Sequence, residues 1–333
     1  MKKTLLIVTA LLLLLVPVIG VFAGGQKTET PAGTPAKEYT FYVVTHGGPA
    51  DPWWGGVFNN GIQAAKKYYG VNIQWMGPEK YSIQKMADMI ETAIAAKPDG
   101  LVVTIPDTSA LEEPLNRAMD QGIPVIAVNV GDTVTVGERI PYLCYVGGAE
   151  YQMGYQAGLR MLREFGSSKP KRGVVLIHEV GHVGLEQRAK GFADAFGEKG
   201  IPVERLAGTP NQSENYQALD AYLTRNDDTD VVFCLGPLGA HPSLSLFKDK
   251  DLFGKVKIGT VDLSPTILAA IKSGQMVFGV DQQAYLQAFL PIGLLILYND
   301  YGIVPTGDIL TGPAIVDAAN VALVEEMINR GIR

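Results

Sequence analysis

The sequence predicts an α/β protein built from two open, parallel sheets. Short runs rich in Val and Ile alternate with amphipathic helical segments along most of the chain, which is typical of βαβ crossovers. Ten strand-like runs approach the upper size of one open sheet, so we expect two sheets of about five strands. The expected strands are Thr40–Val44, Val71–Met76, Gly100–Ile105, Pro124–Asn129, Tyr142–Val146, Gly173–Ile177, Val203–Leu206, Val231–Leu235, Lys257–Val261 and Met276–Val280.

The segments between most of these strands carry apolar residues at helical spacing. Phrases such as KPDGLVV and DDTDVVF mark the points where a helix ends and the next strand begins. Helices of this kind should cover both faces of each sheet. Those we expect include Gly56–Tyr69, Ile83–Ala96, Leu111–Gln121, Glu150–Phe165, Leu185–Lys199 and Glu214–Thr224.

The N-terminus has the features of a cleaved secretory signal. Lys2 and Lys3 precede an apolar run from Leu5 to Ile19, and Val21-Phe22-Ala23 is a small-x-small cleavage site. We expect residues 1–23 to be removed and residues 24–37, which are small, polar and proline-bearing, to form a flexible leader. No cysteine lies near the cleavage site, so we expect a freely diffusing periplasmic protein rather than a lipoprotein.

Size and charge exclude several classes of protein. The 333-residue chain has a formal net charge of −6 and no basic cluster, which argues against a nucleic-acid partner. The length remaining after cleavage suggests two domains. Cys144 and Cys234 are the only cysteines, and each lies in an apolar run. Two buried thiols are therefore expected rather than a disulfide or a metal site.

The loop after the first strand predicts a ligand site. In an open α/β sheet, ligands bind beyond the carboxyl ends of the strands. Here the sequence VTHGGPADPWW places His46, Asp51, Trp53 and Trp54 at such an end. Flat apolar faces beside a carboxylate suit the faces and hydroxyls of a sugar. The alternatives are that both tryptophans anchor the core and that His46 is a structural histidine.

A second pattern, His178-Glu179-Val180-Gly181-His182, matches the HExxH motif of zinc peptidases. That motif works only on a helix, where both histidines share one face. Here VVLI leads directly into His178 and two glycines follow, so the motif should lie at a strand-to-loop junction. We expect no metal and no peptidase activity, with Glu179 or His182 available to contact a ligand.

From Tyr39 to about Asn320 the chain resembles the periplasmic sugar-binding proteins of ABC transporters, in particular the ribose-binding branch. The phrases that carry the resemblance, in order, are DPWWGGVFNNGIQAA, KPDGLVVTIPDTSALEEPLNRAMDQGIPVIAVN, QRAKGFADAF, GTVDLSPTILAAIKSGQM and VDQQAYLQAFLPIGLLILY. This resemblance implies the type I periplasmic binding protein fold, in which two Rossmann-like, doubly wound domains are joined by three hinge strands and hold the ligand between them.

The resemblance also implies the domain boundaries. The hinges should lie near Cys144–Gly147, Val280–Gln282 and Thr311–Pro313. The N-terminal lobe would then comprise residues 38–145 and 283–311, and the C-terminal lobe residues 146–282 and 312–333. The resemblance further implies a monomer that delivers a small sugar or polyol to the permease subunits of an ABC transporter. It implies no cofactor.

Carried over residue by residue, the resemblance implies several ligand contacts. The aromatic pair of the family falls on Trp53 and Trp54, with Asp51 beside them. The family's arginine at the start of a helix falls on Glu186, with Arg188 two residues further on. The remaining contacts fall on Asn129, Asp262, Gln282 and Gln283, whereas a family arginine is replaced by Val130 and a family asparagine by Gly236.

These substitutions favour a neutral, polyhydroxylated ligand. Asp51, Glu186 and Asp262 are hydrogen-bond acceptors when ionised and suit hydroxyl donors. Asp262 could instead cap the helix that follows it. A nucleotide-dependent enzyme is excluded because neither GxGxxG nor a Walker loop is present, and a DNA-binding regulator of this fold would carry a helix-turn-helix in place of the signal peptide. A chemosensory or signal-molecule receptor remains the alternative.

Overall fold

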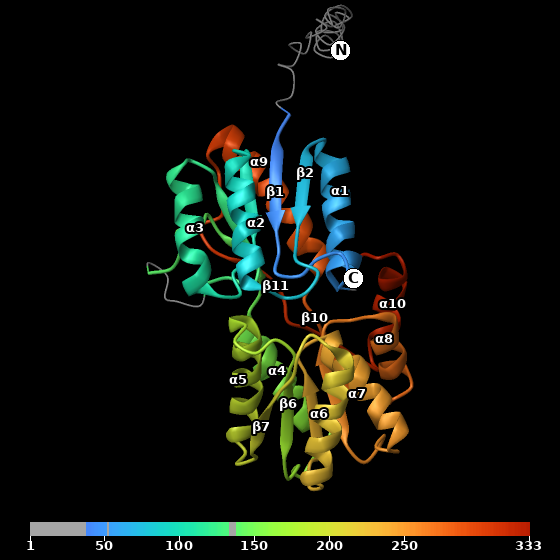
Figure 1. The fold of residues 1–333 in the computed structure, drawn as a ribbon. Helices are drawn as coiled ribbons and strands as arrows, with labels where there is room; N and C mark the ends of the chain where they lie inside the picture. The colour runs from blue at the N-terminus through green and yellow to red at the C-terminus, as the bar shows by residue number, and fades with distance from the viewer. Residues whose placement is uncertain (1–37, 52, 133–137) are drawn as a thin grey trace, which may run out of the picture. The chain divides into compact units, whose positions relative to one another are not determined.

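The computed structural model describes residues 38–51, 53–132 and 138–333. The predicted signal peptide 1–23 and leader 24–37 lie outside the described residues. Within 38–333, the chain forms two six-stranded sheets, each covered by helices (Figure 1). We call the sheet that contains the first strand, with its helices, the first lobe, and the other sheet, with its helices, the second lobe.

The sheet of the first lobe is parallel throughout. Its strand order is β11-β5-β4-β3-β1-β2, and all five strand pairs are parallel. The inner strands β3 and β4 are buried along their whole length, as expected when helices cover both faces. The strands are β1 Thr40–Val44, β2 Asn72–Met76, β3 Gly100–Val103, β4 Val125–Asn129, β5 Tyr145–Gly148 and β11 Ile309–Gly312.

Helices pack on both faces of this sheet, each over its own core. Successive strand side chains point to opposite faces, so Val102 joins one core, while Leu101 and Val103 join the other. The first core contains the apolar faces of α1 and α9, and the second contains those of α2 and α3. These helices are α1 Asn59–Tyr69, α2 Ile83–Ala95, α3 Thr108–Asp120 and α9 Ala284–Tyr301.

The second lobe repeats this arrangement with one antiparallel strand. Its order is β12-β10-β9-β8-β6-β7, and only β12 runs antiparallel, to β10. Helices α4 and α5 cover one face, and α6, α7, α8 and α10 cover the other. The elements are α4 Glu150–Arg163, β6 Gly173–Ile177, α5 Val183–Gly197, β7 Val203–Ala207, α6 Gln212–Arg225, β8 Val231–Cys234, α7 Pro237–Asp249, β9 Lys257–Val261, α8 Pro265–Lys272, β10 Phe278–Asp281, β12 Ala314–Asp317 and α10 Val321–Asn329.

The chain passes between the lobes at three points. It leaves the first sheet after β5, returns after β10 and leaves again between β11 and β12. The predicted two-domain, doubly wound fold with three crossings is therefore confirmed. The exact domain boundaries given above remain a prediction.

The structure corrects the expected strand count. Each sheet has six strands rather than about five, because β11 and β12 at the third crossing were not among the ten expected runs. The fifth strand is also displaced, from the expected Tyr142–Val146 to Tyr145–Gly148. Gly147 and Gly148 continue the pairing with β11, although glycine is a poor strand former and gave no strand signal.

The first expected helix, Gly56–Tyr69, is divided in the structure. A π-helical segment, η1 Trp54–Phe58, precedes α1, and Gly56 has non-helical dihedral angles within it. Glycine tolerates such angles without a Cβ penalty. At neighbouring Gly55, a Cβ atom would lie 2.2 Å from the carbonyl oxygen of Pro49, so a side chain there would displace the loop that carries the tryptophans.

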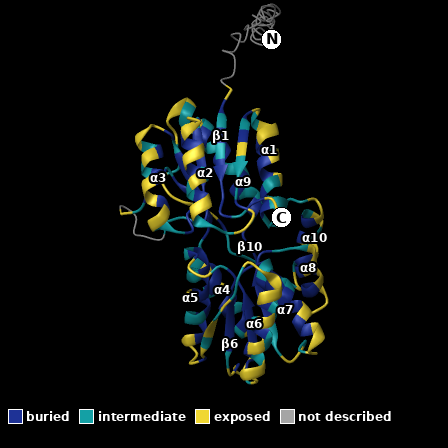
Figure 2. Cartoon of the chain, viewed as in Figure 1, coloured by how far each residue is buried: buried dark blue, intermediate teal, exposed yellow. Residues whose placement is uncertain are grey.

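Figure 2 shows that the buried residues concentrate on the strands and the sheet-facing sides of the helices. Cys144 and Cys234 are buried free thiols, as predicted. In the described part of the chain, every helix is too short or too polar to span a bilayer.

Candidate functional site

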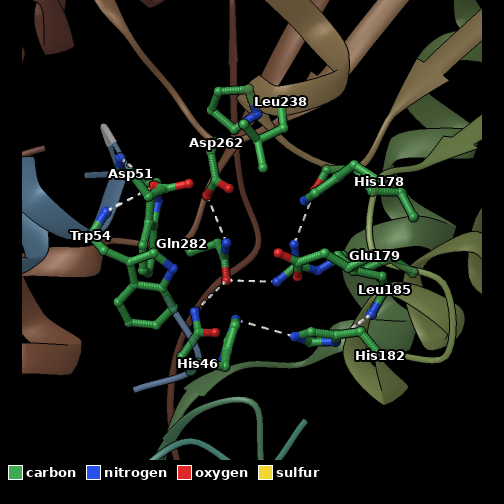
Figure 3. Close-up of a pocket in the computed structure, with 15 residues that line it drawn as sticks. His46, Asp51, Trp54, His178, Glu179, His182, Leu185, Leu238, Asp262 and Gln282 are labelled. Atoms are coloured by element: carbon green, nitrogen blue, oxygen red, sulfur yellow. Dashed lines mark hydrogen bonds between the residues drawn. The ribbon is translucent and has the colours of Figure 1, made fainter. Parts of the chain in front are cut away.

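A cavity lies at the carboxyl ends of the strands and is lined by residues of both lobes (Figure 3). Its position matches the rule that ligands bind beyond these strand ends in open α/β sheets. The first lobe contributes loop residues that follow β1 and β4, and the second contributes residues that follow β6, β8 and β9. The lining residues are His46, Asp51, Trp53, Trp54, Asn129, His178, Glu179, His182, Leu185, Arg188, Leu235, Pro237, Leu238, Asp262 and Gln282.

Asp51 holds the tryptophan pair in place. Its Oδ1 accepts hydrogen bonds from the backbone amides of Trp53 at 2.8 Å and Trp54 at 3.2 Å. The two indole rings meet edge to face, with centroids 4.5 Å apart. Trp54 is also packed into the core against Phe58, whereas Trp53 is only half-buried. Trp54 therefore belongs to the core and also lines the cavity. The two alternatives from the sequence, a core anchor and a ligand contact, are compatible at this residue.

Two polar side chains enter the cavity from strand ends with left-handed backbone. Asn129 is the last residue of β4 and has a φ of 62°, and Asp262 follows β9 with a φ of 67°. Residues other than glycine rarely adopt this region, and they concentrate at functional sites. Gln283, which follows β10, has φ of 56°, but its side chain donates to the Thr311 carbonyl at 2.7 Å instead of lining the cavity.

Gln282 connects the two lobes at the second crossing. Its Nε2 donates to Oδ1 of Asp262 at 2.6 Å, and its Oε1 accepts from Arg188 Nη2 at 2.9 Å and from Asn129 Nδ2 at 3.4 Å. Gln287 of α9 supports this network by accepting from Asn129 at 3.0 Å and donating to the Gln282 carbonyl. These bonds fix the orientation of the Gln282 amide.

Arg188 of α5 is the only lysine or arginine among the lining residues, and its charge is compensated. It is 4% exposed. Its Nε pairs with Oε2 of Glu150, the first residue of α4, and its Nη1 donates to the Leu235 carbonyl at 3.3 Å. Burial works to lower the pKa of Arg188, but Glu150, together with Asp262 and Tyr145, outweighs it, so the guanidinium stays charged. The pair is therefore neutral as a unit.

The three carboxylates that line the cavity have raised pKa values. Burial raises the pKa of Asp262 to about 7 and that of Glu179 to about 8. Burial also raises the pKa of Asp51, although its bonds to the two tryptophan amides oppose the shift. The Asp51 charge adds to the rise at Glu179. Hydroxyl donors from a ligand would relieve this desolvation by hydrogen bonding to the ionised forms.

Three histidines line the cavity in their neutral form. Burial is the main cause that lowers the pKa of His46 and His178 to about 3 and that of His182 well below its usual value. The Nδ1 atom of His178 is buried and has no hydrogen-bond partner in the described part of the chain. A buried polar atom without a partner is costly, and a ligand hydroxyl in the cavity would supply one.

His46, Glu179 and His182 also bring their potential metal-ligating atoms within 4.8 Å of one another. The HEVGH motif lies, as expected, at the junction between β6 and α5, with His182 as the N-cap of the helix. Nδ1 of His182 accepts from the amides of Gly184 and Leu185 at 3.1 and 3.3 Å. A neutral imidazole with an accepting Nδ1 carries its proton on Nε2, so Nε2 offers no lone pair to a metal.

Most of the residues predicted from the sequence line the cavity. His46, Asp51, Trp53, Trp54, Asn129, Glu179, His182, Arg188, Asp262 and Gln282 do so, whereas Glu186 and Gln283 do not. Glu186 points away from the cavity lining, and its role as a ligand contact remains a prediction. Its carboxylate pairs with Arg205 and accepts from the Gly181 amide at 3.2 Å. Residues two apart on a helix point to nearly opposite faces, so Arg188 rather than Glu186 reaches the cavity.

Sequence reasoning missed several lining residues and one partner. His178 was considered only within its motif, and Glu150 gave no signal because an acidic residue at the start of a helix is common. Leu185, Leu235, Pro237 and Leu238 form an apolar part of the lining. Val130, which replaces a family arginine, lines a separate groove.

The comparison with protein families decides the assignment. Residues 41–299 match the periplasmic binding protein domain family. The chain belongs to this family. The xylose/arabinose-binding protein XylF of Sulfolobus acidocaldarius is 26% identical over 298 residues, which cover 82% of this chain and 73% of that protein.

Solved structures extend this result to the fold. A periplasmic sugar-binding protein of an ABC sugar transporter from Legionella pneumophila is 29% identical, with a TM-score of 0.76 over 83% of this chain and 100% of the other. A carbohydrate transporter from Acidothermus cellulolyticus, in complex with myo-inositol, is 30% identical, with a TM-score of 0.80 over 89% and 100%. The predicted resemblance to sugar-binding proteins of ABC transporters is confirmed.

Proposed function

We propose that this chain is an extracytoplasmic solute-binding protein that captures a neutral monosaccharide, pentose-like in size, or a related polyol. The ligand enters the cavity between the two lobes, the lobes close about the three crossings, and an ABC permease receives the ligand from the closed form. Family membership supports the general role. The chemistry of the cavity supports the choice of ligand.

The observation that carries the ligand class is the charge balance of the cavity. Its one guanidinium, on Arg188, is paired with Glu150, whereas Asp51, Glu179 and Asp262 have no cationic partner of their own among the described lining residues. A phosphate or carboxylate would need an unpaired arginine fork or a bare helix N-terminus. Arg188 was itself a predicted contact, and its pairing with Glu150 supports a neutral ligand.

The remaining groups match the surface of a sugar. Trp53 and Trp54 offer apolar ring faces beside Asp51, and Asp262, Asn129 and the unpartnered Nδ1 of His178 offer hydrogen-bonding atoms. Sugars present apolar C–H faces and a rim of hydroxyls. An aromatic wall with convergent polar groups is therefore a suitable binding site.

The ligands of similar proteins support the same class. The Sulfolobus relative is named for xylose and arabinose, and the Acidothermus structure holds myo-inositol. All three are neutral and polyhydroxylated. We propose that this chain binds within that group, and the carboxylate-rich cavity gives the physical reason.

Location and partners complete the proposal. We propose that residues 1–23 direct export, that the protein acts in the periplasm as a monomer, and that it binds its ligand without chemical turnover or zinc. Delivery to ABC permease subunits is the partner interaction. A role as a chemosensory or signal-molecule receptor would use the same cavity and differ only in the partner.

A thermal-shift panel tests this proposal. A ligand that binds only the folded state raises the melting temperature in proportion to RT ln(1 + [L]/Kd). The panel should contain pentoses, hexoses, polyols, methylthio-sugars and sugar phosphates. We expect the strongest stabilisation from a neutral compound. A sugar phosphate that stabilises more than every neutral compound would contradict the charge argument.

A further inference from the structure

Two buried histidines from opposite lobes meet directly. Nε2 of His46, in the loop after β1, lies 3.2 Å from Nε2 of His182, in the loop after β6. Their rings are nearly perpendicular, with centroids 4.6 Å apart. Figure 3 marks the hydrogen bond between them with a dashed line. His46 is 7% exposed and His182 is 2% exposed. The contact is therefore a single hydrogen bond between imidazoles, and its direction depends on their tautomers.

The backbone fixes the tautomer of His182. Its Nδ1 accepts from the amides of Gly184 and Leu185, which begin α5. Those amides can only donate, so Nδ1 must be unprotonated and the proton of the neutral ring lies on Nε2. His182 is therefore the donor in the bond between the lobes.

The contacts of His46 assign it the other neutral tautomer. Thr104 Oγ1 accepts from the backbone amide of His46 at 3.0 Å and donates its own hydrogen toward Met86 Sδ at 3.9 Å. Because His182 donates through Nε2, Nε2 of His46 must accept and carries a lone pair. The proton of the neutral His46 ring then lies on Nδ1, which is 3.0 Å from Thr104 Oγ1 and donates to it.

We infer that His46 and His182 form a latch between the lobes, which holds the ligand-bound cavity closed through one N–H···N bond and releases the ligand in acid. The inference rests on the proposed capture by closure. Two other contacts join the lobes at the same place. The Val183 amide donates to the Pro106 carbonyl at 3.1 Å, and the Tyr81 ring packs against His182 with centroids 5.9 Å apart.

Protonation of either ring would break the latch. A proton on Nε2 of His46 would face the Nε2 proton of His182, so that two donors oppose each other. A proton on Nδ1 of His182 would face the two helix amides and the positive end of the α5 dipole. Acid therefore opposes closure through both histidines.

The charged neighbours of the latch have opposite effects on how closure depends on pH. The Arg188 guanidinium lies near both rings and disfavours their protonation, as does a charge on His178. The Glu179 carboxylate lies within the same cluster, and Glu150 lies close to the start of α5. Glu179 and Asp262 have raised pKa values in this conformation, so their own proton uptake favours closure as pH falls. Only variants of the histidines isolate the latch.

The experiment compares sugar affinity at about pH 8 and about pH 5 in wild type and in histidine variants, with the neutral sugar identified by thermal shift. If a histidine with its ordinary pKa must lose its proton when the lobes close, the sugar binds about 30-fold more weakly at the lower pH. In His46→Gln, the side-chain amide can still accept from His182 but cannot titrate. We expect this variant to reduce the pH dependence by at least about tenfold relative to wild type, whatever its affinity at the higher pH.

Two variants and a control separate the latch from other histidines. His182→Asn retains an N-cap acceptor but is too short to reach His46, so we expect weaker binding at both pH values. His178→Asn and His241→Asn should keep the pH dependence of the two latch residues. His241 is the control because it lies outside the cavity lining and bonds to Ser264.

The outcomes are distinct. A wild-type pH dependence that persists in His46→Gln would overturn the latch. Loss of the contact between His46 and His182 after treatment with a chelator would also overturn it, because that result would indicate a bridging metal. If no sugar in the panel binds, the proposed function fails separately. In that case nitrogen spectra at about pH 8 test the bond in the conformation described here, in which His182 carries the Nε2–H tautomer and His46 the Nδ1–H tautomer.

Discussion

Gln282 donates a hydrogen bond from its side-chain amide to Oδ1 of Asp262 over 2.6 Å. Gln282 follows β10, where the chain returns to the first lobe, and Asp262 follows the neighbouring strand β9. The carbonyl oxygen of the same amide accepts from Arg188. These bonds connect an ionisable carboxylate of the cavity to a residue at a crossing between the lobes.

Asp262 should be a principal acceptor for the sugar. Replacing it with Asn removes the charge while conserving the shape, and hydrogen bonds to charged groups are worth about 1.5–3 kcal/mol. We expect Asp262→Asn to weaken binding of the identified sugar by about 2 kcal/mol, measured by titration calorimetry. Asp251→Asn is the matched control, because Asp251 is exposed and bonds to Lys255. Equal affinity in Asp262→Asn and the control would remove Asp262 from the binding site.

The two tryptophans should differ in what their loss costs. Trp53 is half-buried and stacks on Phe58, so Trp53→Ala should weaken sugar binding by about 2 kcal/mol or more, the scale of an aromatic hot spot, with a smaller loss of stability than Trp54→Ala. Trp54 is 6% exposed and packs on Phe58, so Trp54→Ala should reduce both affinity and stability. The free energy of unfolding and the affinity would be measured for each.

The third tryptophan provides the control for this prediction. Trp75 lies outside the cavity lining and donates to Thr45 Oγ1 at 2.9 Å. Trp75→Phe should leave the sugar affinity unchanged. Unchanged sugar affinity in a folded Trp53→Ala protein would show that the ligand does not contact this ring.

The ion pair of Glu150 and Arg188 should set the preference for neutral ligands. Glu150→Gln removes the compensating charge and leaves a buried cation, and breaking a buried pair typically costs about 3–5 kcal/mol of stability. We expect a lower melting temperature together with improved binding of ribose 5-phosphate relative to ribose. The exposed pair of Arg117 and Glu113 offers the control variant Glu113→Gln. An unchanged preference in Glu150→Gln would mean that compensation of Arg188 does not select the ligand.

Glu179 should make the ligand-free fold less stable as pH rises. Its pKa is raised from the usual value to about 8, mainly by burial. The folded state therefore binds a proton that the unfolded state has released, so this contribution to stability is present in acid and is lost as pH rises toward about 8. Glu179→Gln cannot lose a proton.

Thermal unfolding checks the sign of this effect. One pKa unit corresponds to about 1.4 kcal/mol, and partial exposure of Glu179 reduces the effect. We expect Glu179→Gln to be more stable than wild type by about 1–2 kcal/mol at about pH 9, with a smaller difference at about pH 5. A difference that grows toward acid would have the wrong sign and would contradict the assignment.

The sequence predicted the fold well because the fold depends on pattern. Strand runs such as Gly173–Ile177 are continuously apolar and buried on both faces, so their period and flanking helices were readable. The short strands β11 and β12 were not, because each has four residues with mixed burial at a crossing between sheets. Their identity depends on partners that are distant in sequence.

The cavity was predictable where a residue follows a strand directly and less so on helices. Asn129 and Asp262 lie at strand ends, where the family resemblance also placed ligand contacts. On α5, a shift of two residues decides between Arg188, which is buried, and Glu186, which faces Arg205. The neutral tautomers of His46 and His182 depend on three-dimensional contacts and had no sequence signal.

Small-angle scattering tests the central claim, capture of a neutral sugar between two lobes that close, most directly. The radius of gyration would be measured with and without a saturating concentration of the sugar identified by thermal shift. Closure about the three crossings predicts a smaller radius of gyration in the bound protein. An unchanged radius of gyration at saturating sugar would contradict capture by closure.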